Sequence, residues 1–307
     1  MPTREERLAA GLIGLLVGDA LGVPYEFHAP EEVPPLSQIE YSPPADFWRS
    51  HPSVPPGTWS DDGAQALCLL DSLLTCGRFD PEDFGQRLVR WLDDGYLAVD
   101  SHVFDVGIQS ANAITKLRAG TPALQAGSTE EHALGNGSLM RVLPLALWHR
   151  GTDAELVADA QAQSRVTHGH MRAQVCCALY CLWARRILDA TANPWDTAVA
   201  TLRALYPLSS LERQELEDGI HPDQPPDGHG GGYMVDAVHS ARWAVMQGDY
   251  ETSVRSAISL GNDTDTTACI AGGIAGLRDG VAAIPQRWRD GLRGKELYTP
   301  LLDALTR

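Results

Sequence analysis

Basic side chains are scarce in this sequence. Its 307 residues include 24 Lys and Arg against 40 Asp and Glu, which gives a net charge of −16 and an isoelectric point near 4.9. A protein that follows a nucleic-acid backbone needs a basic stripe, so the charge argues against that class of partner. An anionic ligand would need local help from backbone N–H groups, helix N-termini or metal ions.

Long apolar runs and paired cysteine motifs are lacking as well. We expect no membrane-spanning stretch and no membrane partner, because glycines and Asp19 interrupt the first apolar segment. Residues 1–7 carry acids as well as bases and do not resemble a signal peptide. None of the six cysteines forms a Cys-x-x-Cys motif, and most lie in apolar helical runs, as reduced thiols do. We therefore expect a cytoplasmic protein.

Two clusters of carboxylates and hydroxyls stand out instead, Ser60-Asp61-Asp62 and Asp263-Thr264-Asp265-Thr266. Each precedes an apolar helical run, so one interpretation is an ordinary helix N-cap. A cap needs only one such side chain, and a second neighbouring carboxylate is unfavourable unless a cation or a proton offsets the repulsion. Carboxylates and hydroxyls are hard ligands that suit Mg²⁺, Mn²⁺ or Ca²⁺. Together the clusters predict a site for two cations.

Apolar periodicity is helical almost throughout, and no segment shows convincing strand alternation. We predict an all-α fold in which residues 1–307 form one compact multi-helix domain, because the two clusters must fold together to share a site. Helices are expected near residues 5–22, 63–76, 81–93, 104–118, 153–164, 171–190, 196–218, 233–247 and 250–260, and then from the second cluster. The proline-rich residues 28–57 form either a lid over the site or a passive surface loop.

The first helix and the residues after it carry two further features. Gly14, Gly18 and Gly22 recur every fourth residue, which favours the close approach of another helix. Glu26 lies between two aromatic residues. Such a carboxylate is paired, bound to a metal or raised in pKa, and the alternative is a plain surface acid.

Three other segments are candidates for ligand contacts. Glycines in Gly135-Asn136-Gly137-Ser138 would let backbone N–H groups approach an anion at a helix start, or the segment is a loop with an N-cap serine. His168 and His170 are separated by one residue, and such a pair is more often polar side chains at a helix start than a zinc site. The glycine run that ends at Tyr233 predicts a close backbone approach or a hinge, and Tyr233 would stack on an adenine or pack in the core.

These motifs together resemble a known family. Ser60-Asp61-Asp62, the segment 135–141 (Gly-Asn-Gly-Ser-Leu-Met-Arg) and Asp263-Thr264-Asp265-Thr266 occur in the order seen in ADP-ribosylglycohydrolases, the dinitrogenase reductase-activating glycohydrolase group. Residues 18–27 also look like that family's N-terminal signature. The resemblance spans most of the chain. It implies an all-α fold and hydrolysis of the bond that joins C1″ of ADP-ribose to an acceptor, with arginine-linked protein favoured.

The resemblance also implies roles for individual residues. Two divalent cations, Mg²⁺ or Mn²⁺, would be held by Ser60, Asp61, Asp62, Asp263, Asp265 and Thr266. Either Asp62 or Glu26 would orient or deprotonate the water. Substrate contacts are expected from Gly135, Asn136, Gly137, Ser138, Met140, His168, Gly231 and Tyr233. The sequence departs from the family at Gly63, where many members have threonine, and at Asn262, where many have a second glycine.

Three other functions stay open at this point. The same scaffold could hydrolyse a different ribosylated small molecule. A non-catalytic relative would bind ADP-ribose or serve a structural role, although the intact set of ligand residues argues against it. A metal-dependent phosphoesterase would release phosphate or cleave the diphosphate, and free ADP-ribose as the product would exclude it.

Overall fold

Two helices from opposite ends of the chain pack at the centre of the protein. The computed structural model describes residues 2–307, and α1 (Arg4–Gly22) lies against α12 (Thr264–Asp279). A Cβ atom on Gly18 would lie 2.1 Å from the carbonyl oxygen of Ala268, so the two backbones touch. The predicted close approach at the glycines is therefore confirmed. The Thr264 hydroxyl donates to the carbonyl of Gly22 at 2.8 Å, which fixes the start of α12 to the end of α1.

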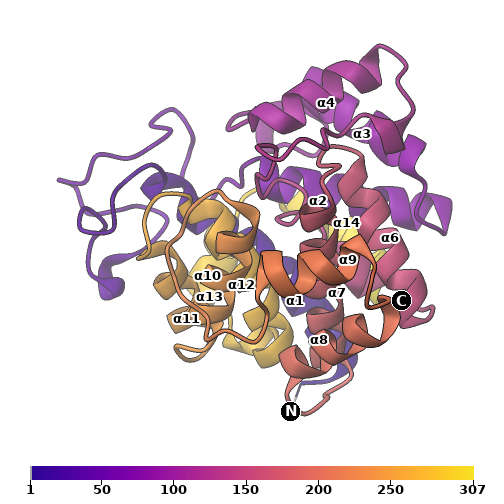
Figure 1. Ribbon diagram of the computed structural model, residues 1–307. Coiled ribbons are helices and arrows are strands. Elements are labelled where there is room, and N and C mark those ends of the chain that lie inside the picture. Colours follow the sequence, from indigo (N-terminus) through magenta and orange to yellow (C-terminus); the bar gives the residue numbers. More distant parts are fainter. Residues whose placement is uncertain (1) are drawn as a thin grey trace.

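The other helices surround this pair, and the predicted all-α fold is confirmed (Figure 1). They are α2 (Asp61–Cys76), α3 (Pro81–Asp94), α4 (Ile108–Arg118), α5 (Leu143–Trp148), α6 (Asp153–Arg165), α7 (Met171–Leu188), α8 (Pro194–Leu205), α9 (Leu211–Gln214), α10 (Met234–Val245), α11 (Tyr250–Ile258), α13 (Gln286–Gly291) and α14 (Lys295–Thr306). Within residues 2–307 the only β-pairing is two isolated bridges, Ser128 with His168 and Gly135 with Tyr233.

Two predicted helices differ from the observed ones. The helix expected from residue 104 begins at Ile108, because Asp105 has a φ of 53° and Gly107 a ψ of 137°, neither of which is helical. The helix expected over 196–218 is interrupted after Leu205, since Pro207 forces Tyr206 into an extended conformation. The chain resumes as α9 and a π-helical turn, Glu215–Ile220.

The first helix also corrects the expectation about membrane-spanning segments. Residues Arg4–Tyr25 are long and apolar enough to cross a membrane by length and composition alone. The most apolar window of this segment is 89% buried inside the protein. Its apolar character is thus accounted for by its place in the core beside α12.

The proline-rich loop projects from the helices as the indigo and purple trace in Figure 1. It contains one short turn, Leu36–Gln38, and is otherwise irregular. The Glu40 carboxylate accepts hydrogen bonds from Arg255 on α11 at 2.7 Å and from Arg287 on α13 at 3.0 Å. The loop is therefore attached to the helical body at its middle.

Candidate functional site

The first acidic cluster lies at the N-terminus of α2, where Ser60 is the N-cap and Asp19 on α1 supplies further acceptors. Asp19 on α1 accepts hydrogen bonds from the backbone N–H groups of Ser60, at 2.9 Å, and Gly63, at 2.7 Å. Burial raises the pKa of Asp19 to about 7. Because Asp19 and the Ser60 hydroxyl satisfy the helix start, the buried Asp61 and Asp62 are not needed as caps.

The same carboxylate explains a departure from the family pattern. A Cβ atom on Gly63 would lie 2.9 Å from Oδ2 of Asp19 and 2.8 Å from the side chain of Leu16. A threonine would therefore collide with both in this chain. Asn262, the other departure, has a φ of 59°, a region that asparagine tolerates better than most residues.

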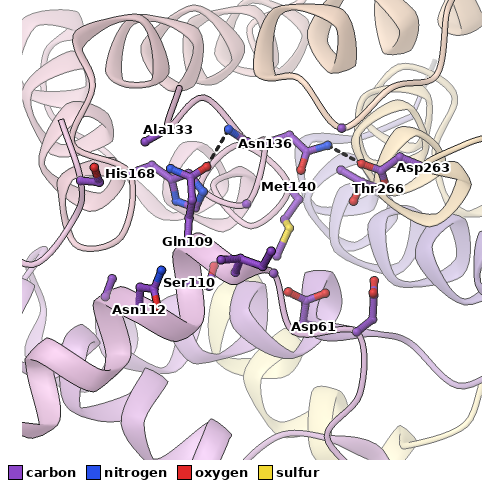
Figure 2. Close-up of a pocket in the computed structure, with 18 of the residues that line it drawn as sticks. Asp61, Gln109, Ser110, Asn112, Ala133, Asn136, Met140, His168, Asp263 and Thr266 are labelled. Atoms are coloured by element: carbon purple, nitrogen blue, oxygen red, sulfur yellow. Dashed lines mark hydrogen bonds between the residues drawn. The ribbon is translucent and has the colours of Figure 1, made fainter. Parts of the chain in front are cut away.

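The second cluster lies at the N-terminus of α12 and meets the first. The Thr266 hydroxyl donates to Oδ1 of Asp62 at 3.3 Å, across 204 positions of sequence. Thr266 also donates its backbone N–H to Oδ1 of Asp265 at 2.9 Å. Asp263 accepts a hydrogen bond from the Asn136 amide at 2.7 Å (Figure 2). The structure thus brings together the residues that the sequence pattern placed in one site.

Two carboxylate oxygens at this junction have no partner. Oδ2 of Asp62 and Oδ2 of Asp265 are buried and make no hydrogen bond within the described part of the chain. Burial, and then the neighbouring carboxylates, hold the pKa of both groups well above the usual range. One oxygen each from Glu26, Asp263 and Asp265 lie within 4.8 Å of one another. Buried, unsatisfied and mutually repelling oxygens of this kind fit hard divalent cations.

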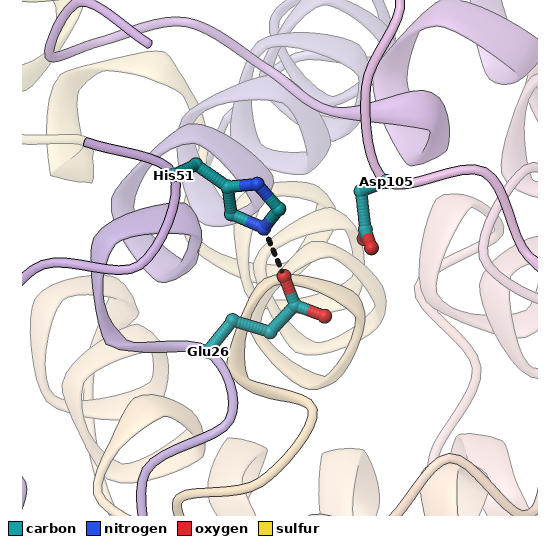
Figure 3. A group of neighbouring side chains, drawn as sticks. All are labelled: Glu26, His51 and Asp105. Carbon is teal, nitrogen blue, oxygen red and sulfur yellow. Dashed lines mark hydrogen bonds and ion pairs between the residues drawn. The ribbon is translucent and has the colours of Figure 1, made fainter. Parts of the chain in front are cut away.

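Glu26, His51 and Asp105 form a second group beside these oxygens (Figure 3). Nε2 of His51, from the proline-rich loop, lies 2.8 Å from Oε2 of Glu26. The Ser50 hydroxyl bonds the Glu26 carbonyl, so the loop holds both the backbone and the side chain of this residue. Burial, reinforced by Asp105 and Asp263, raises the pKa of Glu26 to about 10. Glu26 is therefore a buried site residue and not a surface acid.

A cavity of about 1140 Å³ opens from the acidic groups. Its acidic end is formed by Glu26, Asp61, Asp62, Asp105, Asp263 and Thr266. The wall opposite comes from α4, the loop 126–133, Gly135, Asn136, Gly137, Met140 and His168, several of which Figure 2 labels. Exposed Phe27 and Ile108 also line it, with 70% and 80% of their surface accessible.

The remaining predicted site residues lie outside the cavity wall. Ser60 and Asp265 stand behind it, within the acidic junction. Ser138 is buried, and its hydroxyl lies 2.8 Å from that of Ser164. Gly231 donates its N–H to Asp236 at 2.5 Å. Tyr233 is 41% exposed, and its hydroxyl accepts a hydrogen bond from Arg172 at 2.9 Å.

The segment 135–138 differs from the predicted anion cradle. No helix starts here, since α5 begins only at Leu143. The N–H of Gly135 donates to Oε1 of Gln109 at 2.7 Å, and that of Asn136 donates to the carbonyl of Gly232 at 3.1 Å. These two amides are used within the protein and do not face an anion, whereas the contact of the segment with substrate stays a prediction. The glycines instead allow the chain to pack against the side chains of Gln109 and His168.

Four residues of the site were given no role from the sequence: Asp19, His51, Asp105 and Gln109. Asp19 had appeared as an interruption of an apolar run and within the N-terminal signature, but with no role of its own. Asp105 was assigned to a helix that begins three residues later. His51 lies within the proline-rich segment, where periodicity gives no orientation. His51 could have been singled out because its irregular segment ends at the first acidic cluster, whereas the segment of Asp105 leads into α4 and gives no such signal.

Comparisons with known proteins identify the family to which this sequence is similar. A sequence profile described as ADP-ribosylglycohydrolase matches residues 1–307. The chain is 30% identical over 290 residues to the ADP-ribosylarginine hydrolase Tri1 of Pseudomonas putida, covering 92% of this chain and 73% of that one. It is 26% identical over 294 residues to the ADP-ribosyl-[dinitrogen reductase] glycohydrolase of Rhodospirillum rubrum, covering 94% and 90%. A solved structure described as an ADP-ribosylglycohydrolase-related protein complex superposes with a TM-score of 0.79 at 32% identity, covering 100% of this chain and 99% of that one.

Proposed function

This chain belongs to the ADP-ribosylglycohydrolase family, and we propose that it is a metal-dependent hydrolase of the glycosidic bond between ADP-ribose and an acceptor. The favoured acceptor is an arginine side chain of a protein. Family and relatives together support ADP-ribosyl hydrolase activity as the general reaction. The proposal adds the cations, the acceptor and the roles of the residues.

The buried oxygens of Asp62 and Asp265 carry the proposal. Each lies at a helix start, faces other carboxylates and has no partner within the described residues. Two divalent cations, Mg²⁺ or Mn²⁺, would be held there by Ser60, Asp61, Asp62, Asp263, Asp265 and Thr266. When bound, they supply positive charge for the ribose hydroxyls and the diphosphate and lower the pKa of a nearby water.

Glu26 and Asp62 have different roles in the proposed hydrolysis. Hydrolysis passes through an oxocarbenium-like state and needs an oriented water. Oδ1 of Asp62 accepts a hydrogen bond from Thr266, and its buried Oδ2 would bind a cation. In Glu26 only Oε2 has a partner, His51, so Oε1 is available to the water. We therefore assign the orientation of the water to Glu26, with Asp62 as a cation ligand. The water adds to C1″, and the released acceptor takes up the proton.

The preference for arginine follows from the charge at the acidic end of the cavity. Asp105 and Glu26 have no Lys or Arg partner among residues 2–307, and His51 is their only basic neighbour. A cationic guanidinium is a better match for such a rim than a neutral serine. The relatives from Pseudomonas and Serratia are ADP-ribosylarginine hydrolases, which supports the same choice.

We also propose that the protein acts in the cytoplasm. The six cysteines are free thiols, five of them buried, as expected in a reducing compartment. The substrate is an ADP-ribosylated protein or small molecule, and the net charge of −16 disfavours binding to a nucleic-acid backbone.

The test is hydrolysis of arginine-linked and serine-linked ADP-ribosyl peptides, each with Mg²⁺, Mn²⁺ or EDTA. Free ADP-ribose is measured by mass. We expect release from the arginine-linked peptide only with a cation, and loss of that release in Asp263→Ala. Release in EDTA would refute the metal requirement. Release only from the serine-linked peptide would refute the acceptor.

A further inference from the structure

Arg141 is a fully buried cation with no carboxylate partner among the described residues. Its guanidinium donates to Oε1 of Gln65 at 2.7 Å, to Oγ1 of Thr167 at 2.7 Å and to Gln163 at 3.3 Å. Arginine has no acceptor, so the hydrogen-bond direction at each contact is fixed. Because Oε1 of Gln65 accepts from Arg141, the amide nitrogen of Gln65 faces Asp61 and donates to its carboxylate at 3.0 Å.

Thr167 connects Arg141 to His168 on the cavity wall and fixes the hydrogen-bond direction there as well. Its hydroxyl lies 2.7 Å from Nδ1 of His168, and Thr167 is fully buried. Since Oγ1 accepts from Arg141, its single hydrogen has one available acceptor, which is Nδ1. A proton on Nδ1 would leave the hydroxyl hydrogen buried without a partner, which is unfavourable.

The imidazole therefore carries its proton on Nε2. Burial and the nearby Arg141 lower the pKa of His168 to about 3, so the ring is neutral at physiological pH. His168 lines the cavity, and its Nε2 makes no hydrogen bond to residues 2–307. A Cβ atom on Gly137 would lie 3.3 Å from Nε2, so glycine keeps this side of the ring open.

Gln109 supplies a second donor beside it (Figure 2). Its Oε1 accepts the N–H of Gly135 at 2.7 Å, so its Nε2 occupies the other end of the amide. That nitrogen is buried, has no partner within the described part of the chain, and belongs to a side chain that lines the cavity. Gly135 lies between the two groups, since a Cβ atom on it would be 2.7 Å from Oε1 of Gln109 and 3.7 Å from Nε2 of His168.

We propose that Nε2–H of His168 and the Nε2 amide of Gln109 form a pair of fixed donors that receives an acceptor oxygen of the ADP-ribosyl group. Arg141 and Thr167 are the positioning residues of this pair, because they determine which imidazole nitrogen faces the cavity. The identity of the ligand rests on the proposed function. The arrangement of the donors does not.

The tautomer can be measured directly in the full-length protein labelled with ¹⁵N-histidine. The His168 signal is assigned by its loss in His168→Gln. We expect the proton on Nε2 in the wild type and in Thr167→Ser, which keeps the hydroxyl. Thr167→Val keeps the volume but removes the hydroxyl, and should give a mixture of tautomers. A wild-type ring protonated on Nδ1 overturns the proposal.

Binding of ADP-ribose, measured by calorimetry in Mn²⁺, tests the function of the pair. We expect Thr167→Val to weaken binding about twofold if the two tautomers are equally populated, because only the ring protonated on Nε2 donates into the cavity, and Thr167→Ser to leave the affinity unchanged. Gln109→Glu keeps the acceptor for Gly135 and removes the donor, so it should weaken binding by at least about tenfold. It does not touch Arg141, so it remains informative if Thr167→Val fails to fold.

Wild-type affinity in Gln109→Glu, or in a folded Thr167→Val, overturns the pair. Failure of the wild type to bind ADP-ribose refutes the proposed function instead. In that case the ¹⁵N spectrum of the free protein still confirms or overturns the arrangement of the donors.

Discussion

Replacing Asp265 by asparagine should stabilise the metal-free protein. Asp265 is fully buried, and one of its oxygens lies within 4.8 Å of an oxygen each from Glu26 and Asp263. Because burial and the neighbouring carboxylates raise the pKa of Asp265, the folded protein must keep this carboxyl protonated near neutral pH, which costs up to about 4 kcal/mol relative to an unfolded-chain pKa of about 3.9. Asparagine keeps the shape and the bond from the Thr266 N–H but carries no charge. We expect the metal-free variant to be more stable by about 2–4 kcal/mol near neutral pH.

The pH dependence of unfolding tests the sign of this stability change independently. Burial and the neighbouring carboxylates raise the folded-state pKa of Asp265 well above that of the unfolded chain. The folded protein therefore binds more protons than the unfolded chain above about pH 4, and stability falls as pH rises through that window. Metal-free wild type should gain stability on mild acidification, and Asp265→Asn should show a shallower slope.

Divalent cations should make the wild type more stable than Asp265→Asn. A ligand at about one hundred times its Kd stabilises the folded state by about 2.7 kcal/mol, and the variant lacks one of the ligands. The assay is urea unfolding followed by circular dichroism, in EDTA and then in Mn²⁺. Asp303→Asn on α14, an exposed position, is the matched control and should behave as wild type. A variant that is less stable than wild type in EDTA, yet gains as much from Mn²⁺, would refute this reasoning.

Three further outcomes are expected. Gly18→Ala should cost at least about 3 kcal/mol in urea unfolding, as in overpacked cores, because its Cβ would lie 2.1 Å from the carbonyl oxygen of Ala268. Gly107→Ala, with nothing within 4 Å, should stay within about 0.5 kcal/mol, and equal losses would contradict the packing argument. The lowered pKa of His168, about 3, means that its stabilising contribution is present above about pH 6.5 and falls by about 1.4 kcal/mol per pH unit below it. His168→Gln should therefore flatten the acid limb of the stability curve measured in urea, and an unchanged limb would show that the ring is protonated in the folded state. Glu26→Gln should lower kcat by about 10²–10⁴-fold with little change in ADP-ribose affinity, as expected for a group that acts on the water, and wild-type kcat would return that role to Asp62.

Most helices could be predicted because their apolar faces are regular. The starts of α2 and α12 were also recognisable, since each carries more carboxylates than a helix cap needs. The meeting of Thr266 with Asp62 was not visible as a contact, but two clusters of hard ligands in one domain were enough to expect it.

Residues that act through tertiary contacts were harder to predict. Asp19 accepts hydrogen bonds from the start of a helix that begins 42 positions later, and its place in the N-terminal signature did not specify that role. Asp105 was missed because backbone with positive φ carries no periodicity. Arg141 belonged to a recognised motif, yet its role depends on Gln65 and Thr167, which only the fold brings into contact.

The close contact of α1 with α12 has a consequence for synthesis in the cell. Roughly 250 residues separate the end of α1 from the end of its partner. At about 5–20 residues per second, the ribosome takes some 12–50 s to supply that partner. During this interval a helix apolar enough to cross a membrane has its glycine face uncovered. The nascent chain should therefore depend on chaperone holding more than a protein whose core pairs neighbouring segments, and it should acquire its acidic centre only in the last step of folding.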